Sequence, residues 1–126
     1  NEDVVVPRGR LVELVTFCET LQARTGIAVA CFGHAGDGNI HVNLMVGDMG
    51  DPRVAGPAEE ALDQLFRFII GIGGAITGEH GVGLAKRRWF ADAVGAGALE
   101  IHQRMKAAMD PTGILNPGKF LEAVSR

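Results

Sequence analysis

The sequence predicts an α+β fold, with a small antiparallel sheet that carries helices on one face and is followed by a C-terminal helical extension. Two segments, residues 10–25 and 62–71, place apolar residues at the three-and-four spacing of an amphipathic helix. Short apolar runs typical of strands lie before, between and after these segments. The chain has 126 residues, of which 47% are apolar and 21% charged, which suits one compact domain with a packed core.

The first strand and the first helix are set by clear local signals. Residues 4–6 form a β-branched run that Pro7 ends, because proline cannot donate a hydrogen bond to a sheet. The helix over residues 10–25 buries one apolar stripe, and Gly26 is well placed to end it.

A hairpin should follow the first helix. Residues 27–32 predict a strand, the glycine-rich residues 33–39 predict a turn, and residues 40–46 predict the next strand. In this third strand, apolar residues alternate with His41 and Asn43, so we expect these two polar side chains on the face opposite the apolar one.

The second half of the chain repeats a helix and a strand before it becomes helical. Residues 47–57 are rich in turn formers, and residues 62–71 then predict the second helix. Residues 74–77 predict a fourth strand. Residues 84–109 predict a helical extension, interrupted near Gly95 and Gly97 and closed by the turn residues that follow it.

The order strand, helix, strand, strand, helix, strand is the split βαβ pattern of the ferredoxin-like fold. Both helices would lie on one face of the sheet. The other face, which should carry His41 and Asn43, is then left for contacts with something other than these helices.

Charge and hydropathy exclude some classes of partner. The net charge is −3 and no long basic stripe is present, so we expect no nucleic-acid partner. The densest basic spot, residues 86–88, is interpreted as a solvated helix face rather than an anion site. No apolar stretch approaches the ~20 residues that cross a bilayer. We expect a cytoplasmic protein, with a peripheral position at the inner face of the membrane, through partner subunits, left open.

Two features bear on the protein's context. Cys18 and Cys31 lie in apolar segments and not in a close-spaced pair, which favours reduced, buried thiols and leaves a disulfide between them open. The first residue is Asn1, and the strand-like residues 2–6 follow without a turn or cap. We therefore expect the chain to be a fragment that begins inside a larger protein.

Two glycine-rich segments, residues 33–43 and 78–83, hold a group of residues that can bind a metal. His34 and His41 flank one tight turn, and Glu79 follows the last predicted strand. Imidazole and carboxylate together suit zinc and similar ions, and a catalytic site needs three protein ligands. The expected fold brings all three to one end of the sheet. Glu79 still has to reach across one intervening strand, ~4.8 Å.

Three other interpretations of these segments compete with a catalytic metal site. Nucleotide phosphate binding is disfavoured, because Gly33, Gly36 and Gly38 reverse the order of the dinucleotide fingerprint and neither segment ends as a P-loop does. A non-catalytic metal- or anion-binding module would use the same histidines structurally, with four protein ligands closing a metal site. An interaction domain whose glycine loops are only turns would leave the histidines far apart.

Three ordered motifs resemble the C-terminal domain of FAD-linked oxidases: HAGDGNIH at residues 34–41, GEHGVG at 78–83 and DPTGILNPGK at 110–119. This family includes the flavin subunit of glycolate oxidase, D-lactate dehydrogenases and D-2-hydroxyglutarate dehydrogenase. EDVVVPR at residues 2–8 also resembles the start of the same region, so the resemblance covers nearly the whole chain.

The resemblance implies a role for individual residues. His34, His41 and Glu79 match positions that hold a divalent metal, commonly zinc, and His80 matches the catalytic base. Asn43 matches a substrate or flavin contact. Asn116 and Lys119 lie in the closing motif, which packs toward the flavin in such enzymes.

The activity implied by the resemblance is oxidation of a 2-hydroxy acid of the glycolate, D-lactate or D-2-hydroxyglutarate type to the 2-oxo acid, with hydride transfer to FAD. FAD would be bound mainly by an N-terminal domain that this chain lacks. We therefore expect residues 1–126 to be the substrate- and metal-binding cap domain, inactive alone. Its expected partners are the substrate and the FAD-binding domain, with a homodimer or electron-transfer subunits left open.

Overall fold

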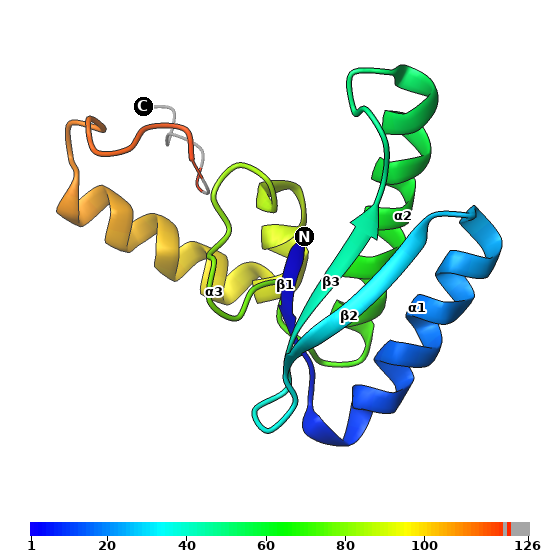
Figure 1. Cartoon of the computed structure of the whole chain (residues 1–126). Helices are drawn as coiled ribbons and strands as arrows, with labels where there is room; N and C mark the ends of the chain where they lie inside the picture. The colour runs from blue at the N-terminus through cyan, green and yellow to red at the C-terminus, as the bar shows by residue number, and fades with distance from the viewer. Residues whose placement is uncertain (120, 122–126) are drawn as a thin grey trace. The chain divides into compact units, whose positions relative to one another are not determined.

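The computed structural model describes residues 1–119 and 121 and divides the chain into two compact units, Asn1–His80 and Gly81–Arg126 (Figure 1). The first unit contains the sheet and two helices, and the second contains one long helix. The division separates the predicted metal ligands, which all lie in the first unit, from the C-terminal motif of the second.

The sheet of the first unit has three antiparallel strands, β1 (Glu2–Val5), β2 (Ala28–His34) and β3 (Asn39–Met45), in the order β1-β3-β2. The central strand β3 therefore pairs on both sides. Its register places His41 opposite Asp3 of β1 and opposite Phe32 of β2. The antiparallel α+β architecture predicted from the sequence is confirmed.

Two helices pack with this sheet, α1 (Leu11–Thr25) and α2 (Pro52–Gly71), and a short 3-10 turn, η1 (Arg8–Arg10), leads into α1. Figure 1 shows both helices on the same side of the sheet. The rings of Phe17 and Phe68 stack with their centroids 4.1 Å apart, which joins the two helices. The fully buried core combines residues of both helices with β1 and β3: Leu14, Leu21, Leu65, Phe66, Ile69, Val4 and Val42.

The helix α2 begins earlier than predicted, inside the stretch interpreted as a turn. Asp51 caps it by accepting a hydrogen bond from the Arg53 amide at 2.9 Å, and Pro52 occupies the first position, where a proline costs no hydrogen bond. Pro57 lies inside the helix. The predicted turn holds over residues 47–51 but was wrong over residues 52–57, because this cap outweighs the turn preference of Gly56 and Pro57.

The predicted fourth strand at residues 74–77 was also wrong, because only one bridge forms. Val5 and Ala75 exchange two backbone hydrogen bonds, of 3.0 and 2.8 Å, on the free side of β1. This is the position that a fourth strand of the split βαβ pattern would take. The ladder stops there because the backbone amides of residues 78–80 turn to a side chain instead.

The second unit is built around α3 (Arg87–Met109), which is interrupted at Gly95 by backbone angles of φ 75° and ψ 164°. The interruption predicted near this glycine is confirmed. After the helix, the carboxylate of Asp110 accepts hydrogen bonds from the amides of Ile114 and Leu115 and from Lys106. This buried carboxylate organises the loop that carries the C-terminal motif.

The basic residues at the start of α3 differ from the predicted solvated face. Lys86 is only 4% exposed, and Arg87 donates a hydrogen bond to the Gly118 carbonyl at 3.1 Å. Arg88 is exposed and lies 4.0 Å from the centre of the Trp89 ring. Within the part of the chain that is described, no helix is both long enough and apolar enough to cross a membrane.

The two cysteines are free thiols that contact each other. Cys18 on α1 is buried, and Cys31 on β2 is half-buried rather than buried as predicted. Their hydrogen bond, together with burial, raises the pKa of the Cys18 thiol well above its usual range. The pair bridges α1 and the sheet without a covalent bond.

Candidate metal centre

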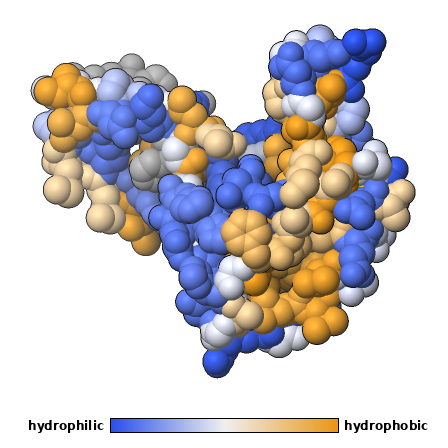
Figure 2. Space-filling view, viewed as in Figure 1, coloured by the Kyte–Doolittle hydropathy of each residue, from blue (hydrophilic) through white to orange (hydrophobic). Residues whose placement is uncertain are grey.

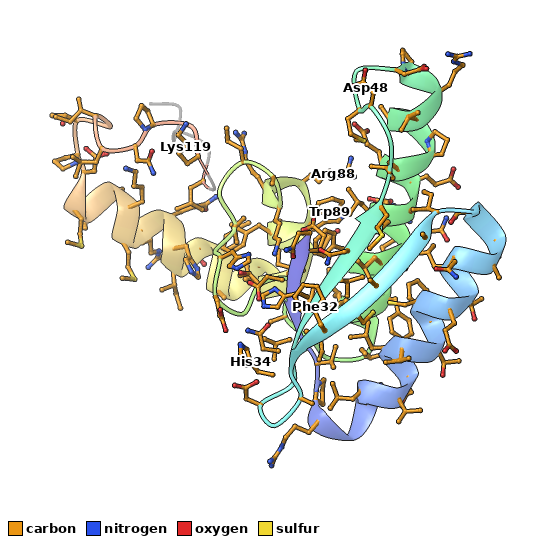
Figure 3. The ribbon with its side chains drawn as sticks, viewed as in Figure 1. Phe32, His34, Asp48, Arg88, Trp89 and Lys119 are labelled. Atoms are coloured by element: carbon orange, nitrogen blue, oxygen red, sulfur yellow. The ribbon has the colours of Figure 1, made fainter. Side chains whose placement is uncertain are left out.

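Three side chains from separate segments of the first unit converge on one point. His34 ends β2, His41 lies in the middle of β3, and Glu79 follows the bridge at Ala75. One potential ligand atom from each lies within 4.8 Å of the others, and His34 Nε2 is 3.7 Å from Glu79 Oε1. Figure 3 shows His34 close to the turn that joins β2 to β3. The convergence expected from the sequence is therefore present.

The donor set fits a divalent ion of the zinc type. Two ligand atoms that each lie ~2.0–2.2 Å from a tetrahedral ion are ~3.4 Å apart, which is close to the separation of His34 and Glu79. The Nδ1 atom of His41 is buried and has no hydrogen-bond partner among the residues described. A buried polar atom without a partner is costly, and a bound ion near this ring is one way to offset that cost.

The hairpin between β2 and β3 positions the two histidines. His34 pairs with Asn39 across the turn, and Phe32 pairs with His41, so both histidines project from the face opposite the helices. The turn requires glycine at position 38, where φ is +83° and an added Cβ would lie 2.1 Å from the Val6 carbonyl oxygen. Glycine is needed here because the turn lies close against the backbone of Val6, and not because a ligand approaches it.

The segment that carries Glu79 is held by Asp3, whose side chain is fully buried on β1. Its Oδ2 atom accepts hydrogen bonds of 2.8 to 3.0 Å from the Thr77 hydroxyl and from the amides of Gly78, Glu79 and His80. Burial alone would raise the pKa of the Asp3 carboxyl, but these hydrogen bonds outweigh it and hold the pKa well below its usual range. Asp3 is therefore a buried anion at ordinary pH.

A second support reaches the Glu79 carboxylate directly. The side-chain amide of Asn39 donates a hydrogen bond of 2.8 Å to Glu79 Oε1. Asn39 is 5% exposed and lies against Gly78, where an added Cβ would be 2.7 Å from its Oδ1 atom. The absence of a side chain at Gly78 therefore leaves space for the Asn39 side-chain amide to reach the Glu79 carboxylate. Partners of this kind orient ligands in metal sites.

His80, the predicted base, lies beside the triad. Its ring stacks on that of His41 with centroids 5.3 Å apart and planes 29° from parallel. Neighbouring side chains on a regular strand point to opposite faces, so Glu79 and His80 share one site only because the strand has ended. The three amides that converge on Asp3 produce this bend. The same bend brings Glu79 past β1, the strand that separates its segment from β3.

The other predicted site residues lie in two places. Asn43 is half-buried on β3, two positions from His41 and on the same face of the sheet. Asn116 and Lys119 are exposed in the second unit, where Asn116 has a φ of 46°. Their contacts with substrate or flavin stay predictions.

Asp3 and Asn39 are the residues that sequence reasoning missed. Asp3 is a charged residue next to an apolar run, and Asn39 stands inside the motif that contains both histidines. An acidic residue in a predicted buried strand needs polar partners, which was the available signal. The partners themselves are 74 to 77 residues away, beyond the reach of local patterns.

Comparison with known proteins agrees with the resemblance seen in the motifs. Residues 1–120 match the family described as FAD linked oxidases, C-terminal domain. This match covers the first unit and most of the second, including every predicted site residue.

The curated relatives are considerably longer than this chain. It is 37% identical over 118 residues to D-lactate dehydrogenase of Anaerostipes hadrus, a match that covers 94% of this chain and 25% of the relative. It is 36% identical over 125 residues to glycolate oxidase subunit GlcD of Bacillus subtilis, covering 99% and 26%. For GlcD of Escherichia coli K12 the identity is 33% over 124 residues, covering 98% and 25%. The chain spans about a quarter of the length of these relatives.

Proposed function

Because the chain belongs to the family of FAD linked oxidases, C-terminal domain, we propose that it forms the substrate- and metal-binding part of an enzyme that oxidises a 2-hydroxy acid. The product is the 2-oxo acid, and hydride passes to FAD. The observation that carries the proposal is the convergence of His34, His41 and Glu79. The names of the relatives point to the same chemistry, since lactate and glycolate are both 2-hydroxy acids.

The triad is proposed to hold a divalent ion, with zinc as the first choice for two imidazoles and one carboxylate. When bound, such an ion supplies Lewis acidity toward the hydroxyl group of the substrate. His80 lies against His41 and is proposed to accept the hydroxyl proton, because histidine side chains titrate near neutral pH. Asn43, on the same face of the sheet as His41, is proposed to contact the substrate or the flavin.

A closed structural metal site is the competing interpretation. Such a site takes four protein ligands, whereas a catalytic site keeps one position for substrate or water. The triad provides three ligand residues, and two of its side chains, His34 and Glu79, are 64% and 52% exposed. Three ligands in an accessible setting favour the catalytic site.

The FAD-binding domain is the proposed partner of the open sheet face. Phe32 and Met45 both project from this face and are 55% and 60% exposed. Figure 2 views the first unit from the same side and shows apolar side chains gathered over β2 and β3. A domain that brings FAD to the metal centre would cover them. A homodimer, electron-transfer subunits, a cytoplasmic location and attachment at the inner membrane face stay proposals.

The proposal is tested first by titrating this chain with zinc. We expect one ion per chain, strong loss of binding in His41→Ala, and unchanged binding in His102→Ala, which removes a histidine of α3 instead. Equal binding by all three proteins would contradict the centre.

The second test concerns activity. The chain alone is expected to carry no flavin and to reduce none, whereas the full-length protein should reduce its flavin when a 2-hydroxy acid is added. Flavin absorbance in this chain as purified, or no reduction in the metal-loaded full-length protein by glycolate, D-lactate and D-2-hydroxyglutarate, would contradict the proposed division of roles.

A further inference from the structure

We propose that Asp3 is a positioning residue of this centre, whose carboxylate holds residues 77–80 in the bend that brings Glu79 and His80 to the histidines of the sheet. The inference rests on the metal centre proposed above and names the group that assembles it. Asp3 touches neither ion nor substrate in this role.

Four hydrogen-bond donors converge on one oxygen atom of Asp3. Asp3 Oδ2 accepts from the Thr77 hydroxyl and from three successive backbone amides, all at 2.8 to 3.0 Å. Successive amides of an extended strand point in alternating directions, so three of them reach one oxygen only when the backbone curls into a concave nest. In most nests the anion is a ligand. Here the chain supplies its own anion.

Asp3 lies in the sheet between the two segments that carry the predicted ligands His41 and Glu79. Its register partner on β3 is His41, and the bridge between Val5 and Ala75 starts the segment on the other side of β1. Asp3 thus ties the segment that carries Glu79 to β1. This strand lies beside β3, which carries His41. The bridge between Val5 and Ala75 is a short backbone pairing, and the Asp3 carboxylate adds four hydrogen bonds to the same segment.

The hydrogen bond from Asn39 to Glu79 depends on the same bend. Its amide reaches Glu79 Oε1 only because the Gly78 backbone lies close against it. Asp3 Oδ2 accepts a hydrogen bond from the Gly78 amide at 2.8 Å. Asp3 therefore fixes the backbone conformation of residues 78–80, and Asn39 orients the Glu79 carboxylate.

A purely structural role has to be separated from positioning, and the chain offers a matched control. Asp110 in the second unit is also buried, at 7% exposure, and also accepts two backbone amides, those of Ile114 and Leu115. Asp110→Asn should therefore cost stability in a comparable way while leaving the triad untouched.

The experiment compares zinc affinity in this chain and in its Asp3→Asn, Asp3→Ala and Asp110→Asn variants, at a temperature at which each is folded by circular dichroism. We expect Asp3→Asn to weaken zinc binding roughly 10–100-fold, the usual effect of losing a partner that orients a ligand, and Asp3→Ala to weaken it at least as much. Asp110→Asn should bind zinc as the unchanged chain does. Equal zinc affinity in Asp3→Asn and the unchanged chain would overturn the proposal.

A measurement without metal keeps the two proposals distinct. Amide hydrogen exchange at residues 78–80 should be faster in Asp3→Asn, with exchange in α1 unchanged. If the unchanged chain binds no zinc, the metal centre fails, while this exchange result still decides whether Asp3 orders the bend. Unchanged protection of these amides would refute the positioning role even if zinc binds.

If both Asp3 variants fail to fold, Thr77→Val provides the test. It replaces the Thr77 hydroxyl, which donates a hydrogen bond to Asp3 Oδ2, by a methyl group of similar size. We expect a folded chain with weaker zinc binding and faster exchange at residues 78–80. A folded Thr77→Val chain that matches the unchanged chain in both measurements would overturn the proposal.

Discussion

His41 has three ring contacts, which makes it the central residue of the site. Its ring lies 5.4 Å from that of Phe32, 6.4 Å from that of His34 and 5.3 Å from that of His80, between centroids. Replacing His41 therefore removes a predicted ligand and also the surface on which the predicted base stacks. The separate contributions of metal and base are measured more cleanly at His34 and His80.

The variant His80→Ala tests the base in the full-length enzyme. We expect kcat to fall by roughly 10²–10⁴-fold, the usual contribution of a positioned general base, while zinc content stays unchanged. His34→Ala is the contrasting variant and should lose zinc together with activity, because one of three ligands is gone. Near-normal flavin reduction by zinc-loaded His80→Ala would remove this histidine from the mechanism.

The site could be predicted from the sequence only where its residues stand in a local pattern. His34 and His41 flank a glycine-rich turn, and Glu79 occupies a second glycine-rich segment, so residue type and spacing were informative. Asp3 lies in no glycine-rich segment of this kind. Its importance depends on the pairing of β1 with β3 and on donors more than 70 residues away, and neither follows from local periodicity.

At the level of the elements, the β2–β3 turn gives a sharp test of backbone geometry. Gly38→Ala introduces a Cβ 2.1 Å from the Val6 carbonyl oxygen at a φ of +83°, so the turn has to shift. We expect a loss of at least about 1–3 kcal/mol in the free energy of unfolding, measured by urea titration, and weaker zinc binding.

Gly36→Ala is the control for this change, because it lies in the same turn, has no positive φ and would meet no atom within 4 Å. It should unfold at nearly the same urea concentration as the unchanged chain. Equal destabilisation by both substitutions would show that the turn is intolerant of alanine for a reason other than this contact.

The loop after α3 should depend on pH through Asp110. The hydrogen bond from Lys106 holds the pKa of this carboxyl below its usual range, and the Leu115 and Ile114 amides lower it further, against the opposing effect of burial. A lowered folded-state pKa means that the stabilisation is present above the unfolded-state pKa and is lost as pH falls through the folded-state value. Acidification should therefore lower the protection of the amides of residues 114 and 115, measured as the intrinsic exchange rate at each pH divided by the observed rate. In Asp110→Asn this extra acid dependence should be absent, and its persistence there would point to another group.

The helices and the hairpin were predictable because their signals are local, whereas the failures came from competition between signals. Gly26 ends α1 with a φ of 72°, as predicted. At α2 the cap at Asp51 overrides the turn preference of Pro57. The fourth strand shrank to one bridge because Asp3 attracts the amides that would have continued the ladder. Neither the hydrophobic periodicity nor the strand propensity of a segment can indicate such a competing tertiary contact.

At the level of the whole chain, the three ligands and their supports all lie within Asn1–His80. Zinc binding should therefore stabilise the first unit directly. At a free zinc concentration of 100 times Kd the gain is ~2.7 kcal/mol. We expect hydrogen exchange to slow more in the sheet and α1 than in α3. The effect should vanish in His34→Ala, and equal slowing in both units would contradict a centre confined to the first.

The wide sequence separation between Asp3 and its donors has a consequence for biosynthesis. The donors follow Asp3 by 74 to 77 residues, so at translation rates of ~5–20 residues per second the carboxylate waits several seconds for them. His34 and His41 emerge from the ribosome well before Glu79. A nascent chain can thus offer two imidazoles early but no three-ligand centre until residues 1–80 have emerged and folded. If the proposed centre binds zinc, loading is therefore expected to follow the folding of this unit.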